Sequence, residues 1–157
     1  MADRTSRKIY ETKGADRLAV PIANGVTLPA GTLVQAESGF ANHYDGTDTL
    51  LGIVLGGENL DSSGDPVGDT SLTPDPAVYI DASGVVVTGI AVASATAIGA
   101  YVYCNDSDLD NATTTQPTTD APIGYIIGYR SASDVDVKLF TPLEHTIGVQ
   151  GGGGAWT

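Results

Sequence analysis

The chain is poor in the residues that build long amphipathic helices. Lysine, glutamate and leucine are few among its 157 residues, and there are only two phenylalanines and one tryptophan. Glycine is abundant at 20 residues, and valine, isoleucine, threonine and tyrosine favour strands. The length suits one domain with a real core but hardly two. We therefore predict an all-β fold, a compact barrel or sandwich of about eight short strands.

Cysteine is almost absent as well. Cys104 stands alone, so no disulfide can form within the chain, which argues against a small secreted scaffold and fits assembly in a reducing cytoplasm. The first residues, "MADRTSRKIYE", carry charges but no apolar run, so we do not expect a signal peptide. These features predict a protein that is made in a reducing cytoplasm.

Basic residues are nearly missing from most of the chain. The first 17 residues have a net charge of +2, whereas residues 18–157 have a net charge of −14. An acidic body repels nucleic acid and anionic membranes, so we expect neither as a partner. The basic N-terminal segment could bind an acidic surface or could simply be solvated. Five of the seven basic residues lie in it: Arg4, Arg7, Lys8, Lys13 and Arg17.

Residues 82–105 lack charge and are long enough to span a bilayer. However, the stretch contains no leucine or phenylalanine and is interrupted by Gly84, Gly89 and Gly99. No lysine or arginine flanks it to set an orientation. Strands joined by short turns explain the composition better than a membrane helix.

The chain divides into three parts by composition. Residues 1–17 form a basic extended arm, residues 18–142 a β domain, and residues 143–157 a glycine-rich C-terminal tail. Within the domain, residues 58–76 are acidic and rich in glycine, proline and aspartate without any period, which predicts a long surface loop.

Several strands can be placed by pattern. "RLAVPIAN" reads as the first strand, and Pro21 suggests that it lies at a sheet edge. "AVYIDASGVVVTGIAV", residues 77–92, predicts a hairpin that turns at 81–84. "SDVDVKLF" alternates strictly, so Val135, Val137 and Leu139 should face the core.

One sequence motif occurs twice, as "LLGIVLGG" and "PIGYIIGY". Each has two glycines four apart, Gly52 with Gly56 and Gly124 with Gly128. The spacing would suit packed membrane helices. The residues between the glycines are β-branched or aromatic and too few for a stable helix, so we predict buried strands bounded by turns. A glycine-led strand precedes each motif. The sequence is compatible with an internal duplication but does not decide it.

The sequence offers no recognisable catalytic motif. His43 and His145 lie in no known pattern, and Cys104 is best read as a small buried hydrophobe. Asp106, Asp108 and Asp110 alternate as calcium ligands do. An EF-hand-like loop, however, needs glycine at its sixth position and glutamate at its twelfth, where this chain has asparagine and proline. We therefore predict a solvated acidic loop, no metal, no cofactor and no enzymatic activity.

With its strands laid out, the chain resembles the head decoration (capsid cement) proteins of tailed bacteriophages. The resemblance runs from about Leu18 to Pro142 and rests on the order of several strand motifs. These are "AGTLVQA", "LLGIVLGG", "VYIDASGVVVTGIAV", "TAIGAYVYCNDSDLDN" and "APIGYIIGYRSASDVDVKLFTP". The 58–76 loop and the segment "EHTIGVQGGGGAWT" depart from the family pattern.

The resemblance implies a compact β domain without enzymatic activity, bound to the outer surface of the virion head. Such proteins bridge neighbouring major capsid protein subunits, are commonly homotrimers and lay an N-terminal arm on the capsid protein. We therefore expect the basic residues of the arm to pair with capsid carboxylates and its apolar residues to fill a seam. The residues concerned are Arg4, Arg7, Lys8, Ile9, Tyr10, Lys13 and Arg17.

Two other classes of binding protein are alternatives. A phage tail-fibre or baseplate domain usually has tandem repeats and a longer chain. A cell-surface or carbohydrate-binding module exposes an aromatic platform, whereas Trp156 lies in the tail and the tyrosines fall within predicted strands. Both would make this chain an adhesive β domain.

Overall fold

The computed structural model describes residue 4 and residues 17–117 and 120–150. Within these residues the chain forms nine strands, one short 3₁₀ helix and one α-helix. The strands are β1 (Arg17–Pro21), β2 (Leu33–Glu37), β3 (Phe40–His43), β4 (Leu50–Gly57), β5 (Ala77–Asp81), β6 (Val86–Ile90), β7 (Tyr101–Val102), β8 (Gly124–Ser131) and β9 (Asp134–Leu139), and the helices are η1 (Leu109–Asn111) and α1 (Pro142–Gln150). The predicted all-β fold is confirmed, with one strand more than expected.

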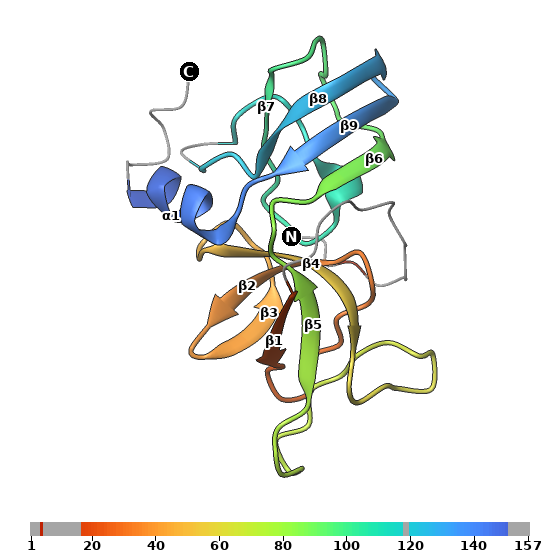
Figure 1. Ribbon diagram of the computed structural model, residues 1–157, viewed down its shortest axis with the longest axis vertical. Coiled ribbons are helices and arrows are strands. Elements are labelled where there is room, and N and C mark those ends of the chain that lie inside the picture. The colour runs from red at the N-terminus through yellow and green to blue at the C-terminus, as the bar shows by residue number, and fades with distance from the viewer. Residues whose placement is uncertain (1–3, 5–16, 118–119, 151–157) are drawn as a thin grey trace.

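The strands form two antiparallel sheets at opposite ends of the long axis (Figure 1). The five-stranded sheet has the order β1-β5-β4-β2-β3, and the four-stranded sheet has the order β6-β9-β8-β7. β1 is an edge strand, as Pro21 predicted. The two edges of the larger sheet approach each other where Ile22 bridges Ala41. Neither sheet is closed by the residues that the structure describes, so the fold is sandwich-like and a barrel is not confirmed.

The core lies on both faces of the five-stranded sheet. Leu33 and Ile53 point into a large apolar cluster that is shared with the four-stranded sheet, where Ile126 is fully buried. The next residues, Val34 and Val54, point into a second cluster inside the curved five-stranded sheet. Successive side chains of a strand face opposite sides, so the apolar run of β4 is buried on both faces, as predicted.

The two glycine-bounded motifs occupy equivalent places in a structural repeat. β4 lies between β2 and β5, and β8 lies between β7 and β9. Gly31 N donates to Val54 O over 2.9 Å, and Gly99 N donates to Ile126 O over 2.8 Å. A β-bulge follows Val54 in β4 and Ile126 in β8. The same three-stranded arrangement thus occurs twice, which supports the internal duplication that the sequence left open.

The first glycine of each motif allows the neighbouring strand to approach closely. A Cβ added at Gly52 would overlap the carbonyl oxygen of Asp81 in β5, and one added at Gly124 would overlap the carbonyl oxygen of Lys138 in β9. A Cβ at Gly56 would meet nothing within 4 Å. The first glycine of each pair therefore makes a tight strand contact, and the second follows a bulge. Their spacing of four residues has no connection with helix packing.

We expect Gly52→Ala and Gly124→Ala to lower the free energy of unfolding by at least about 1–3 kcal/mol, because backbone has to move to admit the methyl group. Gly56→Ala is the matched control, and its expected change is within about 0.5 kcal/mol. Urea unfolding of the three variants measures the difference. Equal midpoints for all three would contradict the close strand contact.

The hairpin predicted for residues 77–92 is wrong. β5 belongs to the five-stranded sheet and β6 to the four-stranded sheet, so the segment between them carries the chain from one sheet to the other. Asp81 Oδ1 accepts hydrogen bonds from the backbone N–H and the hydroxyl of Ser83. Gly84 has a φ of 72°. The turn chemistry was read correctly, but a local pattern does not show which strand each neighbour pairs with.

The alternating strand near the C-terminus folds as predicted. β9 pairs with β8 through a short turn, and Val135, Val137 and Leu139 are buried. In β8 the alternation places Ile126 in the core and leaves Ile127, within the bulge, 37% exposed. The second motif, in β8, is therefore buried on one face only.

The predicted glycine-rich tail begins as a helix. α1 starts with a capping box in which Thr141 N donates to Glu144 Oε1 and Glu144 N donates to Thr141 Oγ1. His145 fixes the helix to the body. Its Nδ1 accepts a hydrogen bond from Leu50 N over 3.1 Å, so the neutral ring carries its proton on Nε2, which lies 3.0 Å from the Tyr44 hydroxyl.

Burial lowers the pKa of His145 to about 4. Its folded-state pKa is thus below the ordinary value of 6.5, and between these values the unfolded chain binds more protons than the folded one. We expect stability to fall by up to about 3 kcal/mol as pH drops from 6.5 to 4, and this contribution to level off below that.

The measurement is urea unfolding of the wild type and of His145→Gln across this pH range. Carboxylates titrate in both proteins, so the difference between the two pH slopes isolates His145. Parallel slopes would contradict the buried neutral ring.

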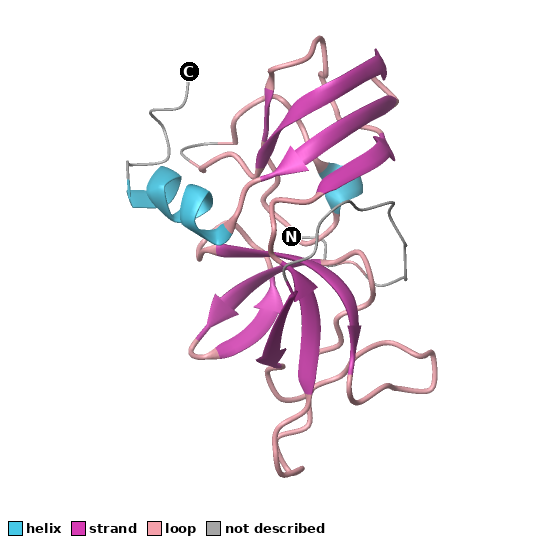
Figure 2. Ribbon diagram, viewed as in Figure 1, coloured by secondary structure: helices cyan, strands magenta, loops and turns pink. Residues whose placement is uncertain are grey.

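The loop 58–76 forms no strand or helix, as predicted, and projects at the end of the molecule away from the four-stranded sheet (Figure 2). Leu60 and Leu72 are exposed on it. Asp65, however, is buried, and the backbone oxygen of the next residue, Pro66, accepts a hydrogen bond from Leu28 N over 2.8 Å. Part of the loop is therefore packed on the body.

Candidate partner-binding surface

The seven residues expected to contact a capsid are only partly visible. Arg4 and Arg17 are described, and the other five lie outside the described residues. These five are Arg7, Lys8, Ile9, Tyr10 and Lys13. Because Arg4 and Arg17 bracket them, the surroundings of these two residues show where the arm joins the body.

Arg4 is bound to the body of its own chain. Its side chain is 3% exposed, and its Nη1 lies 2.7 Å from Asp108 Oδ1 while its Nη2 lies 3.8 Å from Asp110 Oδ2. Its backbone N donates to the Ser107 hydroxyl over 2.9 Å. A buried guanidinium paired in this way is not presented to a partner. The expectation that Arg4 binds capsid carboxylates is therefore corrected.

The acidic loop that holds Arg4 is not simply a solvated turn. Asp106 is buried and accepts hydrogen bonds from Asp108 N and Asn111 Nδ2. Asp108 caps η1 by accepting from Asp110 N. The aspartates at alternate positions therefore organise the loop and bind an arginine. In the part of the chain that the structure describes, no group of three His, Cys, Asp or Glu side chains is placed to hold a metal ion.

Cys104 belongs to the same network. Its Sγ donates to the backbone oxygen of Asp106 over 3.3 Å, and burial raises the pKa of the thiol to about 12. The thiol is therefore protonated and inert at neutral pH, which fits a small buried side chain.

His43 contacts this network from β3. Its Nε2 lies 2.9 Å from the backbone oxygen of Thr27, an acceptor, so this nitrogen carries the proton. Its Nδ1 then accepts from the Ser107 hydroxyl at 2.7 Å. A serine paired with a histidine is a catalytic arrangement when a substrate can reach it. Here Ser107 is fully buried beneath Arg4, so the bond holds the loop against β3.

We expect Arg4→Met to lower the free energy of unfolding by about 1–3 kcal/mol, because it leaves Asp108 without its charged partner in a partly buried site. Arg17→Met removes the same group from an exposed position, and its expected effect is within about 0.5 kcal/mol. Chemical denaturation of the two variants makes the comparison. Equal stability would mean that Arg4 does not anchor the arm.

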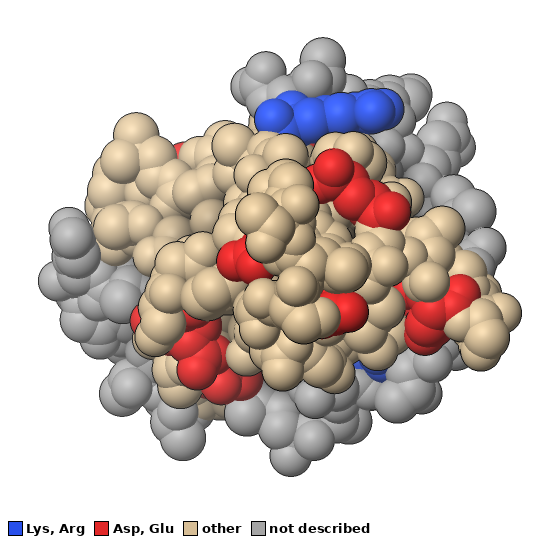
Figure 3. All heavy atoms as spheres, turned by 90° about the horizontal axis from the view of Figure 1, so that it is seen from below, with Lys and Arg blue, Asp and Glu red and all other residues tan. Residues whose placement is uncertain are grey.

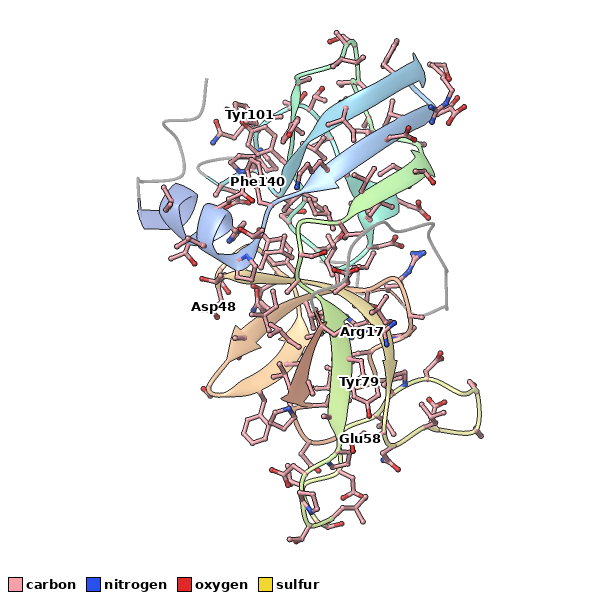
Figure 4. The ribbon with its side chains drawn as sticks, viewed as in Figure 1. Arg17, Asp48, Glu58, Tyr79, Tyr101 and Phe140 are labelled. Carbon is pink, nitrogen blue, oxygen red and sulfur yellow. The ribbon has the colours of Figure 1, made fainter. Side chains whose placement is uncertain are left out.

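Arg17 lies at the other end of the arm, on an open surface. It begins β1, and Arg17, Leu18 and Ala19 are exposed at the edge of the five-stranded sheet. Ala19 pairs with Tyr79 of β5, which is also exposed, and Arg17 and Tyr79 lie on the same side of the two strands (Figure 4). The arm thus enters the body at an accessible sheet edge.

The charge around this end of the molecule is mixed. Seen from the end that carries the five-stranded sheet, Asp and Glu side chains are scattered over the face and basic side chains show at its margin (Figure 3). On the face seen in Figure 3 the visible acidic groups are separated from one another by other side chains.

Comparisons with known proteins give no further assignment. The chain matches no protein-family model, no curated protein and no solved structure. No helix in the described ranges is long and apolar enough to cross a membrane. Residues 82–105, whose lack of charge raised that question, contain β6, β7 and the loop between them.

Proposed function

We propose that this chain is a structural virion protein that binds the outer surface of a phage head and stabilises it by bridging neighbouring major capsid protein subunits. The observation that carries the proposal is the junction of arm and body. A basic, partly apolar segment leads into an exposed edge strand, β1, of an otherwise acidic β domain. The resemblance of residues 18–142 to capsid cement proteins supports the same function.

In this proposal the arm makes the main contact with the shell. Arg7, Lys8, Lys13 and Arg17 pair with carboxylates of the capsid protein, and Ile9 and Tyr10 pack into an apolar seam between subunits. Exposed ion pairs contribute only about 0–1 kcal/mol each, so the two apolar residues matter as much as the charges. Ordering the arm opposes binding, and each contact therefore adds less than its gross value.

Arg4 has a different role in this account. Because it is held by the loop 106–110 and Arg17 starts β1, residues 5–16 connect two fixed points on the body. A segment attached at both ends has fewer conformations to lose on binding than a free tail. Arg4 therefore acts as a positioning residue for the arm.

The protein acts as many copies on one shell. We propose that copies associate as a homotrimer, the state that the resemblance implies, so that one particle presents several arms to adjoining subunits. Linked contacts of modest affinity add up through their effective concentration. The polar loops, such as 58–76, face solvent on the decorated particle.

The experiment is cosedimentation of the purified chain with undecorated heads formed by the major capsid protein of the same phage. Whole host cells and glycan-coated beads serve as parallel samples. We expect saturable binding to heads and none to cells or beads. Binding to cells or beads without binding to heads would establish an adhesive β domain and overturn the proposal.

A further inference from the structure

A groove of about 440 Å³ opens between the four-stranded sheet and α1. Tyr101 and Tyr125 are cross-strand neighbours in β7 and β8, and both rings lie against Phe140, with ring centroids 6.4 and 6.2 Å apart. Figure 4 shows Tyr101 and Phe140 on the side of the sheet that faces the helix. The groove is lined by Gly99, Tyr101, Tyr125, Phe140, Glu144 and Ile147.

Among the described residues, two exposed isoleucines lie at or beside the groove. Ile147 of α1 is 57% exposed, and Ile98, next to Gly99, is 65% exposed. Large aliphatic side chains around an aromatic hollow form the kind of surface that binds an apolar group.

The structural repeat shows what covers the equivalent face in the first half of the chain. The hydrogen bonds and bulges described above align the two units of the repeat. In this alignment Tyr101 corresponds to Leu33, and Tyr125 corresponds to Ile53. Leu33 and Ile53 are fully buried because the part of the chain that follows, the four-stranded sheet, packs over them. In the second unit the chain that follows is α1 and then residues 151–157.

We propose that the groove binds the side chain of Trp156 from the C-terminal segment of the same chain. Trp156 is the only tryptophan and lies outside the described residues, six positions after the end of α1. Six residues reach at most about 20 Å, whereas Ile147 precedes the helix end by about 4.5 Å of helical rise. The linker between them, Gly151–Gly154, permits the reversal that brings the segment back along the helix.

The groove suits an indole by its chemistry. Aromatic rings that surround an indole gain offset or edge-to-face contacts in addition to the burial of apolar area. The indole N–H needs an acceptor when it is buried, and Glu144 brings a carboxylate to the groove. The capping bond to Thr141 uses Glu144 Oε1, and the second carboxylate oxygen is the acceptor we assign to the indole.

Binding within one chain is favoured over binding between copies. A short flexible linker gives its end an effective concentration of about millimolar, far above the micromolar protein concentrations of a solution experiment. The same groove on a second copy competes only when copies are concentrated.

Fluorescence of the full-length protein tests the proposal, because excitation selective for tryptophan reports on Trp156 alone. At submicromolar concentration we expect a blue-shifted emission maximum and weak quenching by acrylamide. Ile147→Ser should shift the emission to longer wavelength and raise the quenching constant several-fold. Leu143→Ser is the matched control, since Leu143 lies one turn earlier on α1, is 70% exposed and does not line the groove.

The other outcomes overturn the proposal. Emission of the wild type equal to that of a free Gly-Gly-Gly-Gly-Ala-Trp-Thr peptide shows an unbound indole. Protected emission that Ile147→Ser leaves unchanged places Trp156 elsewhere on the protein. Protection that appears only at concentrations where the protein self-associates makes a second copy the occupant.

Discussion

Ile126→Asp is expected to abolish soluble folding. Ile126 is fully buried in the cluster between the two sheets, where a carboxylate would have no partner. Burying an unpaired charge costs several kcal/mol, and replacing the isoleucine also removes its apolar contacts. Together these losses are comparable with the whole stability of a small domain. Ile53→Asp, at a buried position of β4 in the same cluster, should behave alike.

Ile127→Asp provides the matched control. The residue is the immediate neighbour of Ile126, but it lies in the bulge of β8 and is 37% exposed. We expect a soluble protein with a cooperative transition. Circular dichroism and urea unfolding of the soluble fractions compare the variants. A soluble, cooperatively folded Ile126→Asp protein would refute the core described here.

Neutralising the arm is expected to remove most of the binding to heads. The variant Arg7→Gln, Lys8→Gln, Lys13→Gln keeps the Arg4 anchor and β1 but deletes three charges from the segment between them. At about 0–1 kcal/mol per exposed pair, affinity per copy should fall by up to about 100-fold. Replacing Ile9 and Tyr10 by serine should cause a loss of similar size. Cosedimentation with undecorated heads, at low and moderate salt, measures both variants.

A control with the same net charge separates local contacts from long-range repulsion. Ser62→Glu, Thr70→Glu, Thr96→Glu lowers the net charge by the same three units at exposed positions of the body. We expect this protein to bind as the wild type does at moderate salt, where charges more than about 10 Å apart are largely screened. Equal loss in both variants would show that overall charge, and not the arm, controls binding.

Much of the fold could be predicted because its signals are local. The alternation of β9, the composition of β4 and the proline of β1 each identified a strand from its own residues. The first wrong prediction concerned 77–92, where turn residues and two apolar runs resemble a hairpin. The runs pair in different sheets, and that choice depends on β4 and β9, which lie far away in the sequence.

The candidate site shows the same limit. The basic character of the arm was evident, but Arg4 finds its carboxylate 104 positions away, and no local pattern indicates which arginine is buried. The helix α1 did leave a signal, the capping pair of Thr141 and Glu144. Its short length and the glycines that follow hid it. The aromatic groove depends on this helix and therefore could not be anticipated.

The most direct test of the central proposal is a density map of decorated heads at a resolution that shows the backbone. We expect the β domain on the outer surface, residues 5–17 lying across the junction of neighbouring major capsid protein subunits, and Arg4 still paired with Asp108. Density for the chain inside the shell, at the tail or bridging no subunits would contradict the account.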